Sequence, residues 1–375
     1  MKRLVLLGGG HSHVEVIRRF AASPPEETRV VLVSTEPQMV YSGMLPGFVA
    51  GHYSFSDCHI ELGPLCRAAR VEFRRAGAVD IDPAARVVRC SDGAHLHYDV
   101  LSVNIGATPQ RDAISGARDL SVPVKPLTRF VASWHGIAED VRSSNAPFAL
   151  AIVGAGAGGV ELALAMQHAL CPVHKRDHRI ALHLLTDTPT ILPDHAAPVR
   201  RKLERILRER GIYVHTGDRV TSIRPGLLQR EHGAPLPVRH ALLTTNAAAP
   251  AWLAHTGLNT DDRGFILVNE ALQSRSHPQV FAAGDVASIE PHALPKSGVY
   301  AVRQGPPLAE NLRRALASRP LVAYSPQRST LALISTGNRY AVASWRGLAL
   351  EGKWVWRWKD RIDRRFIAKY RIGNL

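Results

Sequence analysis

Three short segments of the chain carry the residue types most able to do chemistry. The first is Gly8-Gly9-Gly10-His11-Ser12-His13, the second runs from Gly154 to Glu161 as GAGAGGVE, and the third contains Gly284-Asp285. Glycines let a backbone turn tightly and approach phosphates, whose charge is met by main-chain amides and the positive end of a helix. The sequence therefore predicts a diphosphate at each of the first two segments.

Each of the two glycine loops lies between a strand-like and a helix-like segment. Residues 4–7 form an apolar run before the first loop, and residues 14–22 after it are helix-like. Residues 148–153 and 160–170 repeat this order around the second loop. Strand, turn and helix form the context of the dinucleotide-binding fingerprint, so the chain is expected to hold two dinucleotides.

Composition limits the remaining possibilities. The chain has 375 residues and 45% hydrophobic content, which is enough for two or three domains with ordinary cores. No segment approaches the roughly 20 apolar residues of a membrane span. Cys58, Cys66, Cys90 and Cys171 lack redox-motif or metal-finger spacing, so we expect free thiols in a reducing, cytoplasmic compartment and no metal.

The formal charge of +15 indicates anionic partners without identifying them. Nucleic acid, an anionic membrane surface and anionic cofactors would all satisfy it. The basic run at residues 200–210 is typical of a solvated helix face. The second run, at residues 357–371, is interleaved with aromatic residues, which favours a membrane surface over nucleic acid.

The order of strand signals predicts an α/β fold with two Rossmann-like domains. Strands are expected at residues 30–34, 71–73, 85–90 and 100–104, then at 149–153, 180–186 and 240–245. Residues 264–268 and 280–283 are expected to form strands whose nearest partner is the N-terminal unit. The first domain would therefore comprise residues 1–119 and 251–325, the inserted domain residues 120–250, and a short α+β segment residues 326–375. A helix over 296–304 should be interrupted at Gly305-Pro306-Pro307, with a new helix from Pro307.

The order of these motifs resembles that of the two-dinucleotide-binding flavoproteins of the pyridine nucleotide-disulfide oxidoreductase superfamily. It is most similar to the branch of type II NADH dehydrogenases and sulfide:quinone oxidoreductases, over nearly the whole chain. The first glycine loop and the segment Tyr41 to Gly47 look like the flavoproteins found beside or fused to selenophosphate synthetase. The resemblance implies FAD, NADH and an electron acceptor such as a quinone or another small molecule.

The resemblance also implies roles at the flavin. Asp285, after Gly284, would accept hydrogen bonds from the ribityl and phosphate region, and Lys296, Ser297 and Gly298 would begin a helix whose positive end faces the flavin pyrimidine. Lys296 could instead be an exposed cap residue. The expected flavin-binding set contains Gly8, Gly9, Gly10, His11, Ser12, His13, Ser42, Pro46, Val79, Asn104, Gly106, Ala107 and Thr108 together with these residues.

The first fingerprint departs from the family pattern in two places. His13 stands where a third glycine is expected, so helix and strand must accommodate a larger side chain. Ser34 occupies the usual acidic position at the end of a strand, and either its hydroxyl or Glu36 would bind the adenosine ribose. His11 and His13 alone cannot build a tetrahedral metal site.

The second loop would bind the nicotinamide dinucleotide through Gly154, Gly156, Gly158 and Gly159. Glu161 either lies near the nicotinamide or is simply favoured by the helix dipole. Asp187 could hold both ribose hydroxyls, and because no arginine immediately follows it, NADH is favoured over NADPH. Asn246 and Ala247 resemble a family turn beside the cofactors. Lys296 and Glu161 are the candidates nearest the chemistry, although hydride transfer requires stacking more than an acid or base.

The acceptor is less clearly indicated. No cysteine pair has the spacing of a redox disulfide, and no cysteine follows Cys171 for sulfide oxidation. Val299 and Arg303 stand where type II NADH dehydrogenases carry two glutamines beside the quinone. This leaves a quinone or other small acceptor, a soluble NAD(P)H-dependent reductase of selenium metabolism, or a non-enzymatic module that senses flavin or nucleotide.

The C-terminal segment predicts an amphipathic helix. Its apolar residues recur every four positions among lysines and arginines: Trp354, Trp358, Ile362, Phe366 and Tyr370. Residues 351–371 would then lie on an anionic membrane, on the inner face, or pack on the body or a second subunit. The chain is expected to be a monomer or a homodimer.

Overall fold

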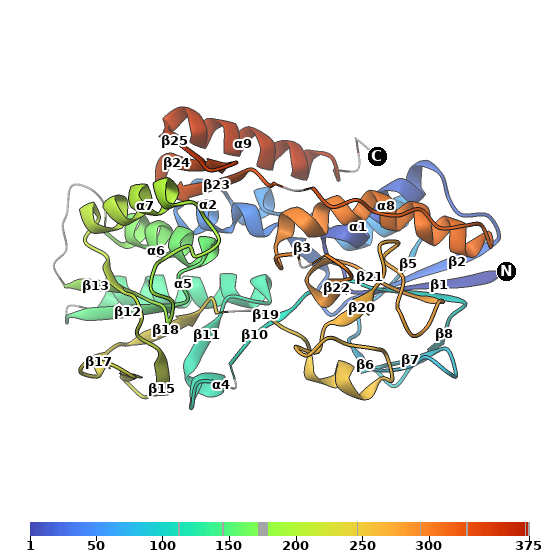
Figure 1. The fold of residues 1–375 in the computed structure, drawn as a ribbon, viewed down its shortest axis with the longest axis horizontal. Helices are drawn as coiled ribbons and strands as arrows, with labels where there is room; N and C mark the ends of the chain where they lie inside the picture. Colours follow the sequence, from blue (N-terminus) through green and yellow to red (C-terminus); the bar gives the residue numbers. More distant parts are fainter. Residues whose placement is uncertain are drawn as a thin grey trace.

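Two α/β lobes lie side by side in the computed structural model, and a third, C-terminal segment lies across both (Figure 1). The structure describes residues 1–375 except 112, 145, 172–178, 246, 293, 328, 372, 374 and 375.

The first lobe is built on a five-stranded parallel sheet in the order β21-β9-β1-β2-β5. Its strands are β1 (Lys2–Leu7), β2 (Thr28–Val33), β5 (Glu72–Arg74), β9 (Val100–Val103) and β21 (Val280–Ala282). The central strands β1, β2 and β9 are mostly apolar and buried because helices cover the sheet. The pairing of β21 with β9 confirms the prediction that residues 280–283 return to the N-terminal unit.

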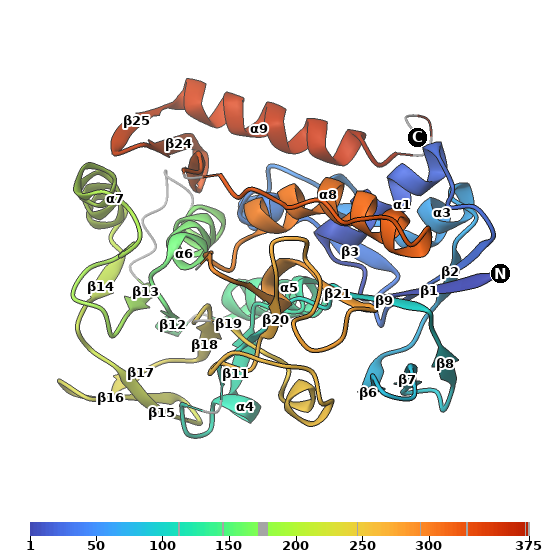
Figure 2. The same cartoon turned by 45° about the vertical axis from the view of Figure 1, so that its right-hand side comes forward.

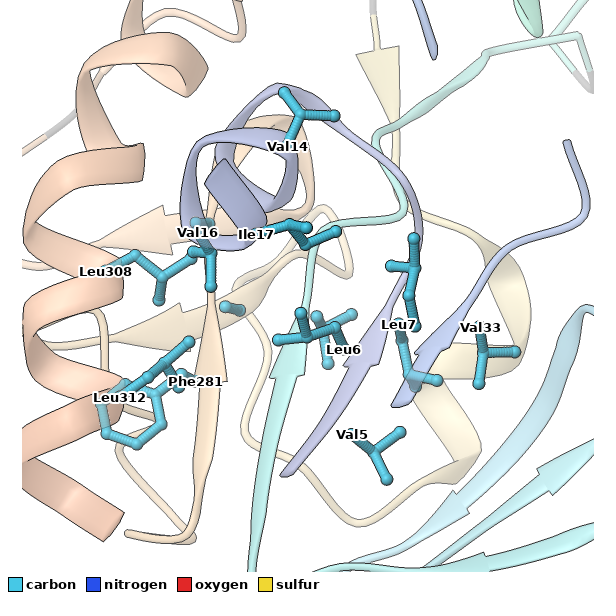
Figure 3. Close-up of a cluster of buried hydrophobic side chains, with 14 of the residues drawn as sticks. Val5, Leu6, Leu7, Val14, Val16, Ile17, Val33, Phe281, Leu308 and Leu312 are labelled. Atoms are coloured by element: carbon cyan, nitrogen blue, oxygen red, sulfur yellow. The ribbon is translucent and has the colours of Figure 1, made fainter. Parts of the chain in front are cut away.

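Two helices of this lobe, far apart in sequence, pack against each other beside the sheet. They are α1 (His11–Ala22) and α8 (Gly298–Leu316). Val16 and Ile17 of α1, Leu308 and Leu312 of α8, and Leu6 of β1 belong to one buried cluster (Figure 3). This contact fixes the N-termini of both helices relative to the carboxyl edge of the sheet.

The second lobe repeats the arrangement with the strand order β11-β18-β12-β13-β14. Its elements are β11 (Ser121–Pro123), β12 (Phe148–Val153), β13 (Ile180–Leu185), β14 (Tyr213–His215), β18 (His240–Leu243), α5 (Leu127–Ser143), α6 (Ala157–Leu170) and α7 (Ala197–Glu209). Helix α2 (Leu45–Val49), from the N-terminal part of the chain, packs on α6. The two lobes therefore contact each other near the Tyr41 loop.

Small antiparallel elements complete both lobes. Strands β10 (Thr108–Pro109) and β19 (Ala247–Ala248) pair where the chain passes between the lobes. The others are β3 (Gln38–Val40), β4 (His59–Glu61), β6 (Ala78–Asp82), β7 (Val87–Cys90), β8 (His95–His97), β15 (Val220–Arg224), β16 (Leu227–Arg230), β17 (Leu236–Pro237), and helices α3 (Leu62–Ala68) and α4 (Ala117–Leu120).

One expectation about the first lobe is confirmed and another is wrong. Strand β20 (Ile266–Val268) packs in the core of the first lobe, as expected, and pairs in parallel with β22 (Ala287–Ile289) rather than with the main sheet. Helix α8 is not interrupted at Pro306 and Pro307 but continues to Leu316. Packing of Leu308 and Leu312 in the core directly after the prolines outweighs the lost amide donors.

The C-terminal segment forms β23 (Ala332–Thr336), β24 (Asn338–Trp345), β25 (Leu348–Gly352) and α9 (Lys353–Ala368). Both views show α9 lying along the side that carries α1, α6, α7 and α8 (Figures 1 and 2). Ile334 and Val342 join the core of the second lobe, whereas Ile367 and Tyr370 join that of the first. No helix in the described part of the chain is long and apolar enough to cross a membrane.

The β23–β24 turn makes the tightest of these contacts and gives a first prediction. Gly337 has φ +81°, and a Cβ there would lie 2.1 Å from the backbone oxygen of Leu164; Gly347 has φ +82° but open space around it. Both changes to alanine incur left-handed strain of roughly 1 kcal/mol. Only Gly337→Ala also displaces the segment from α6, so we expect a lower melting temperature for it than for Gly347→Ala. Equal melting temperatures would contradict this contact.

Candidate active site

Asn104, directly after β9, connects three parts of the first lobe and is 3% exposed. Its Oδ1 accepts hydrogen bonds from the amides of Ser12 (3.1 Å) and His13 (3.3 Å) at the start of α1. Its Nδ2 donates to the backbone oxygen of Ala283 at 2.6 Å. One side chain therefore fixes the first glycine loop relative to the Gly284-Asp285 turn.

Three glycines pack directly on Asn104. A Cβ would lie 2.5 Å from the Asn104 backbone oxygen at Gly8, 2.3 Å from its Oδ1 at Gly10, and 2.5 Å from its Nδ2 at Gly284. Gly8 and Gly284 also have positive φ values of +89° and +74°. Larger residues would separate these backbones, so the glycines are required by close approach as well as by conformation.

The first loop keeps main-chain donors free. The Ser12 amide donates to Asn104, and its hydroxyl donates to Ala301 O at 2.7 Å. The amides of Gly9, Gly10 and His11 have no acceptor among the described residues. Located at the N-terminus of α1, these donors fit a diphosphate, which agrees with the predicted location of FAD.

His13 explains how the loop manages without its third glycine. At the corresponding position of the second loop, a Cβ on Gly159 would lie 1.9 Å from Gly154 O. In the first loop the buried imidazole of His13 contacts the equivalent oxygen, with Nδ1 2.6 Å from Gly8 O and Nε2 2.8 Å from Ser102 Oγ. A hydrogen bond thus replaces the close approach of helix and strand. Across the described residues, no group of three or more His, Cys, Asp or Glu side chains could hold a metal ion.

At the end of β2, the hydroxyl of Ser34 donates to the backbone oxygen of Glu36 at 3.0 Å. Because its donor is used locally and Ser34 is buried, the carboxylate of Glu36 is the better acceptor for a ribose hydroxyl. Between the two alternatives we therefore favour Glu36.

The second loop lies between β12 and α6 and has an open outer side. Thr244 Oγ1 donates to Gly154 O at 2.8 Å, which fixes the turn beside β18. A Cβ on Gly156 or Gly158 would meet no atom within 4 Å. Space beside the positive end of α6 fits a second diphosphate.

Glu161, one turn into α6, points toward the C-terminal segment. Its Oε1 accepts hydrogen bonds from the amide (2.8 Å) and hydroxyl (3.1 Å) of Ser335. Burial raises the pKa of Glu161, while Lys359 and Ser335 oppose the shift. The described contacts thus include a partner that neither sequence interpretation of Glu161 had considered.

A cavity of about 280 Å³ lies at the N-terminus of α8. Its wall includes Gly284, Asp285, Lys296, Ser297 and Tyr300. Helix α8 begins at Gly298 with Ser297 as its N-cap, two residues after the expected start at Lys296. A cavity at a helix N-terminus, beside an acidic residue, fits the polar edge of a flavin and its ribityl chain.

Lys296 lies within this wall rather than on the surface. Its ammonium lies 3.9 Å from the centre of the Phe265 ring and donates to Ala287 O. Burial lowers the pKa of Lys296 to about 8, although Asp261 and Asp285 favour its charged form. Lys296 is therefore not a simple exposed cap residue.

On the other side of α8's N-terminus, the structure gathers aromatic residues from three segments. Tyr41 stacks on Phe366 of α9 with ring centres 4.3 Å apart, and His11 lies at 5.7 Å from Tyr41. The Nε2 atom of His11 is buried without a partner among the described residues. Ser42 Oγ also reaches this point, 3.2 Å from a Cβ built on Gly298.

The remaining predicted residues lie at varied distances from this centre. Pro46 is buried in α2, and Thr108 pairs with Ala248, next to Ala247, at the crossing between the lobes. Gly106 and Ala107 precede that crossing. Asp187 is exposed just after β13, whereas Val79 lies on β6 with its side chain 51% exposed. Asn246 falls outside the described residues.

The cysteines agree with the sequence interpretation. All four are free thiols in the described structure, and three are buried. Burial raises the pKa of Cys58 and Cys66 to about 12 and raises that of Cys90. Because thiolates are the reactive form, these three residues are poor nucleophiles or relay groups.

Three side chains with charged or polar contacts at the site were not predicted from the sequence. Lys125, before α5, forms an ion pair with Asp285 at 2.7 Å. Gln304 Oε1 accepts a hydrogen bond from the Gly284 amide at 2.6 Å. Buried Lys359 of α9 donates to Gly43 O and Asp363 Oδ2, both at 2.6 Å. The contacts of Lys125 with Asp285 and of Lys359 with Gly43 join segments far apart in sequence, so no local motif signals them.

The buried imidazole of His13 gives a prediction about pH. Burial lowers the pKa of His13 from 6.5 to about 4, so below pH 6.5 the unfolded chain binds a proton that the folded chain refuses. The free energy of unfolding should therefore fall as pH decreases from about 6.5 to about 4, by up to about 1.4 kcal/mol per pH unit for this group. Thermal melts of His13→Gln should show a flatter pH dependence than the wild-type protein. An unchanged slope would show that His13 does not titrate in this way.

Comparisons with known proteins agree with this architecture. The family described as pyridine nucleotide-disulphide oxidoreductase matches residues 2–305. The chain is similar to a sulfide-quinone reductase of Aquifex aeolicus, at 21% identity over 100% of this chain and 92% of the relative. It is also similar to a type II NADH:quinone oxidoreductase of Staphylococcus aureus, at 21% identity over 100% of this chain and 96% of the relative.

Solved structures confirm the predicted α/β fold class. The sulfide:quinone oxidoreductase of Aquifex aeolicus superposes with a TM-score of 0.83 at 20% identity, over 100% of this chain and 92% of that chain. NDH2 from Plasmodium falciparum, solved with NADH, gives a TM-score of 0.80 at 14% identity, covering 100% and 99%. The chain therefore belongs to the pyridine nucleotide-disulphide oxidoreductase family, whose oxidoreductases bind FAD and NADH.

Proposed function

We propose that this protein is an FAD-dependent NADH dehydrogenase that passes electrons to a quinone or another small acceptor. The observation that carries the proposal is the convergence of both glycine loops and α9 on one centre. The ring of Phe366 on α9 lies 6.2 Å from that of His11 in the first loop. Lys359 of α9 reaches Gly43 O of the first lobe, and its charge acts on Glu161, which follows the second loop. Bound FAD would supply a hydride acceptor at this junction.

The residues of the chain would then bind, orient and exclude water. The amides of Gly9, Gly10 and His11 would hold the FAD diphosphate, and Asp285 would accept from its ribityl hydroxyls. The N-terminus of α8 and Lys296 would place positive charge beside the flavin pyrimidine, where reduction adds negative charge. The stacked pair Tyr41 and Phe366 would exclude water from the side opposite the nicotinamide.

Two features of the chain bear on the identity of the acceptor. Similarity to quinone-reducing relatives over the whole chain supports a quinone. The exposed side chains of Val299 and Arg303, at the first turns of α8 where such relatives would carry glutamines, favour a different small acceptor. A selenium compound is one such acceptor, suggested by the resemblance of the Tyr41 loop alone.

The outer face of the C-terminal segment supports attachment to an anionic membrane. Trp354 (52% exposed), Trp358 (40%) and Ile362 (41%) form a stripe on α9, and Lys353, Arg357 and Arg361 adjoin it. Exposed apolar residues of the preceding hairpin accompany it: Trp345, Leu348 and Leu350. The predicted stripe is thus divided, because Phe366 and Tyr370 pack inward instead. Aromatic residues flanked by cations suit a headgroup layer.

A reduction experiment tests the enzymatic proposal. The purified protein should carry FAD, and NADH should bleach the flavin under anaerobic conditions faster than NADPH does. Asp187→Ala removes the carboxylate expected to hold the ribose hydroxyls, so the NADH concentration for half-maximal reduction should rise by about tenfold. Asp194→Ala, an exposed acidic change after the same strand, serves as the control. A flavin that NADH leaves oxidised would refute the proposal.

Membrane attachment is tested by co-sedimentation with anionic vesicles. The triple change Trp354→Ser, Trp358→Ser and Ile362→Ser alters only exposed positions and should abolish most binding, with little change in melting temperature. Tyr213→Ser removes an exposed aromatic residue from the edge of the second lobe and should bind as the wild-type protein does. Equal sedimentation of all three proteins would rule out this face as the attachment site.

A further inference from the structure

Lys125 connects the second lobe to the flavin side of the first. It lies between β11 and α5, where the chain has just entered the second lobe. Its Nζ lies 2.7 Å from Asp285 Oδ2, across 160 residues of sequence. The Asp285 side chain is 12% exposed, so the carboxylate of this ion pair is largely shielded from water.

The ion pair between Lys125 and Asp285 lies at the cavity expected to hold the flavin. Asp285 lines the cavity at the N-terminus of α8, together with Lys296. The charges of Lys125 and Asp285 both act on His11 in the first glycine loop. Lys125 therefore lies within the electrostatic environment of the site, although it belongs to the other lobe and to no glycine motif.

The ion pair also constrains the geometry of Asp285. A charge-assisted hydrogen bond to Oδ2 fixes the carboxylate and leaves Oδ1 for a further donor. A carboxylate held in this way is prepared to accept from a hydroxyl without reorganising. Lys125 also balances the negative charge of Asp285. Asp285 therefore cancels less of the positive potential that Lys296 and the N-terminus of α8 create at the cavity.

We propose that Lys125 is a positioning residue for the flavin site, which orients Asp285 from the second lobe and adds positive charge beside the cofactor. This inference rests on the proposed binding of FAD. It assigns to the NADH-binding lobe a direct part in holding and tuning the flavin. Without Lys125, Asp285 would be free to rotate and would place an uncompensated negative charge at the cavity.

The test uses the full chain loaded with FAD and two measurements that do not depend on turnover. The first is the dissociation constant for FAD. The second is the affinity of the bound flavin for sulfite, whose adduct carries negative charge on the ring and therefore reports nearby positive charge. Lys125→Met removes the charge and keeps the length of the side chain, whereas Lys125→Arg keeps the charge. Lys202→Met breaks a comparable ion pair, Lys202 to Glu351 at 2.9 Å, away from the cavity.

We expect Lys125→Met to weaken FAD binding by about tenfold and sulfite binding by at least about threefold. Lys125→Arg should restore both to within about twofold, and Lys202→Met should change neither. If Lys125→Met lowers only the melting temperature while sulfite affinity per bound flavin is unchanged, Lys125 is merely a link between lobes and the inference fails. A wild-type protein that binds no FAD would instead refute the proposed function.

Discussion

The site depends on the position of Asn104. Its amide oxygen holds the start of α1 and its amide nitrogen holds the residue before Gly284. Gly8, Gly10 and Gly284 all lie against this residue, so the two segments expected at the diphosphate and at the ribityl chain are fixed to a common support. Because Asn104 is buried at the end of a central strand, the sheet itself determines their separation.

A second constraint lies between the lobes and comes from the C-terminal segment. Ser335 of β23 holds Glu161 of the second lobe, while Lys359 of α9 holds Gly43 of the first. Tyr370 donates to the buried carboxylate of Glu15 on α1 at 2.9 Å, and Lys369 forms an ion pair with it at 2.6 Å. The C-terminal segment thus links the two lobes through charge-assisted contacts. Breaking them would leave buried charged groups without partners.

Local sequence patterns were sufficient for the parts of the fold that local physics determines. The glycine loops, the apolar strands beside them and the turn at Asp285 lie where their spacing predicts. The continuity of α8 could not be predicted from Pro306 and Pro307, since tertiary packing outweighs the local penalty. Strand β25 was not predicted from its sequence, Leu-Ala-Leu-Glu-Gly, in which apolar and polar residues do not alternate.

The same distinction applies to the candidate site. Motifs located the residues expected to meet phosphates through their backbone, where glycine is a chemical requirement. The side chains that support those residues, such as Lys125, Gln304 and Lys359, come from distant segments and have ordinary local contexts. Their importance follows from burial and from the partner, which only the three-dimensional arrangement provides. His13 is intermediate, because the departure from glycine was visible while its compensating contact with Gly8 O was not.

Helix α9 carries both contacts to the candidate site and the exposed aromatic stripe. Its inner face carries Lys359 and Phe366, which contact Gly43 O and stack on Tyr41 at the candidate site. Its outer face carries the exposed stripe of Trp354, Trp358 and Ile362. Because a helix of 16 residues is stiff, a surface that held the outer stripe would also restrain the inner contacts. Membrane attachment and the shape of the candidate site would then both depend on α9. A substitution on one face of α9 should therefore also be tested for its effect on the contacts of the other face.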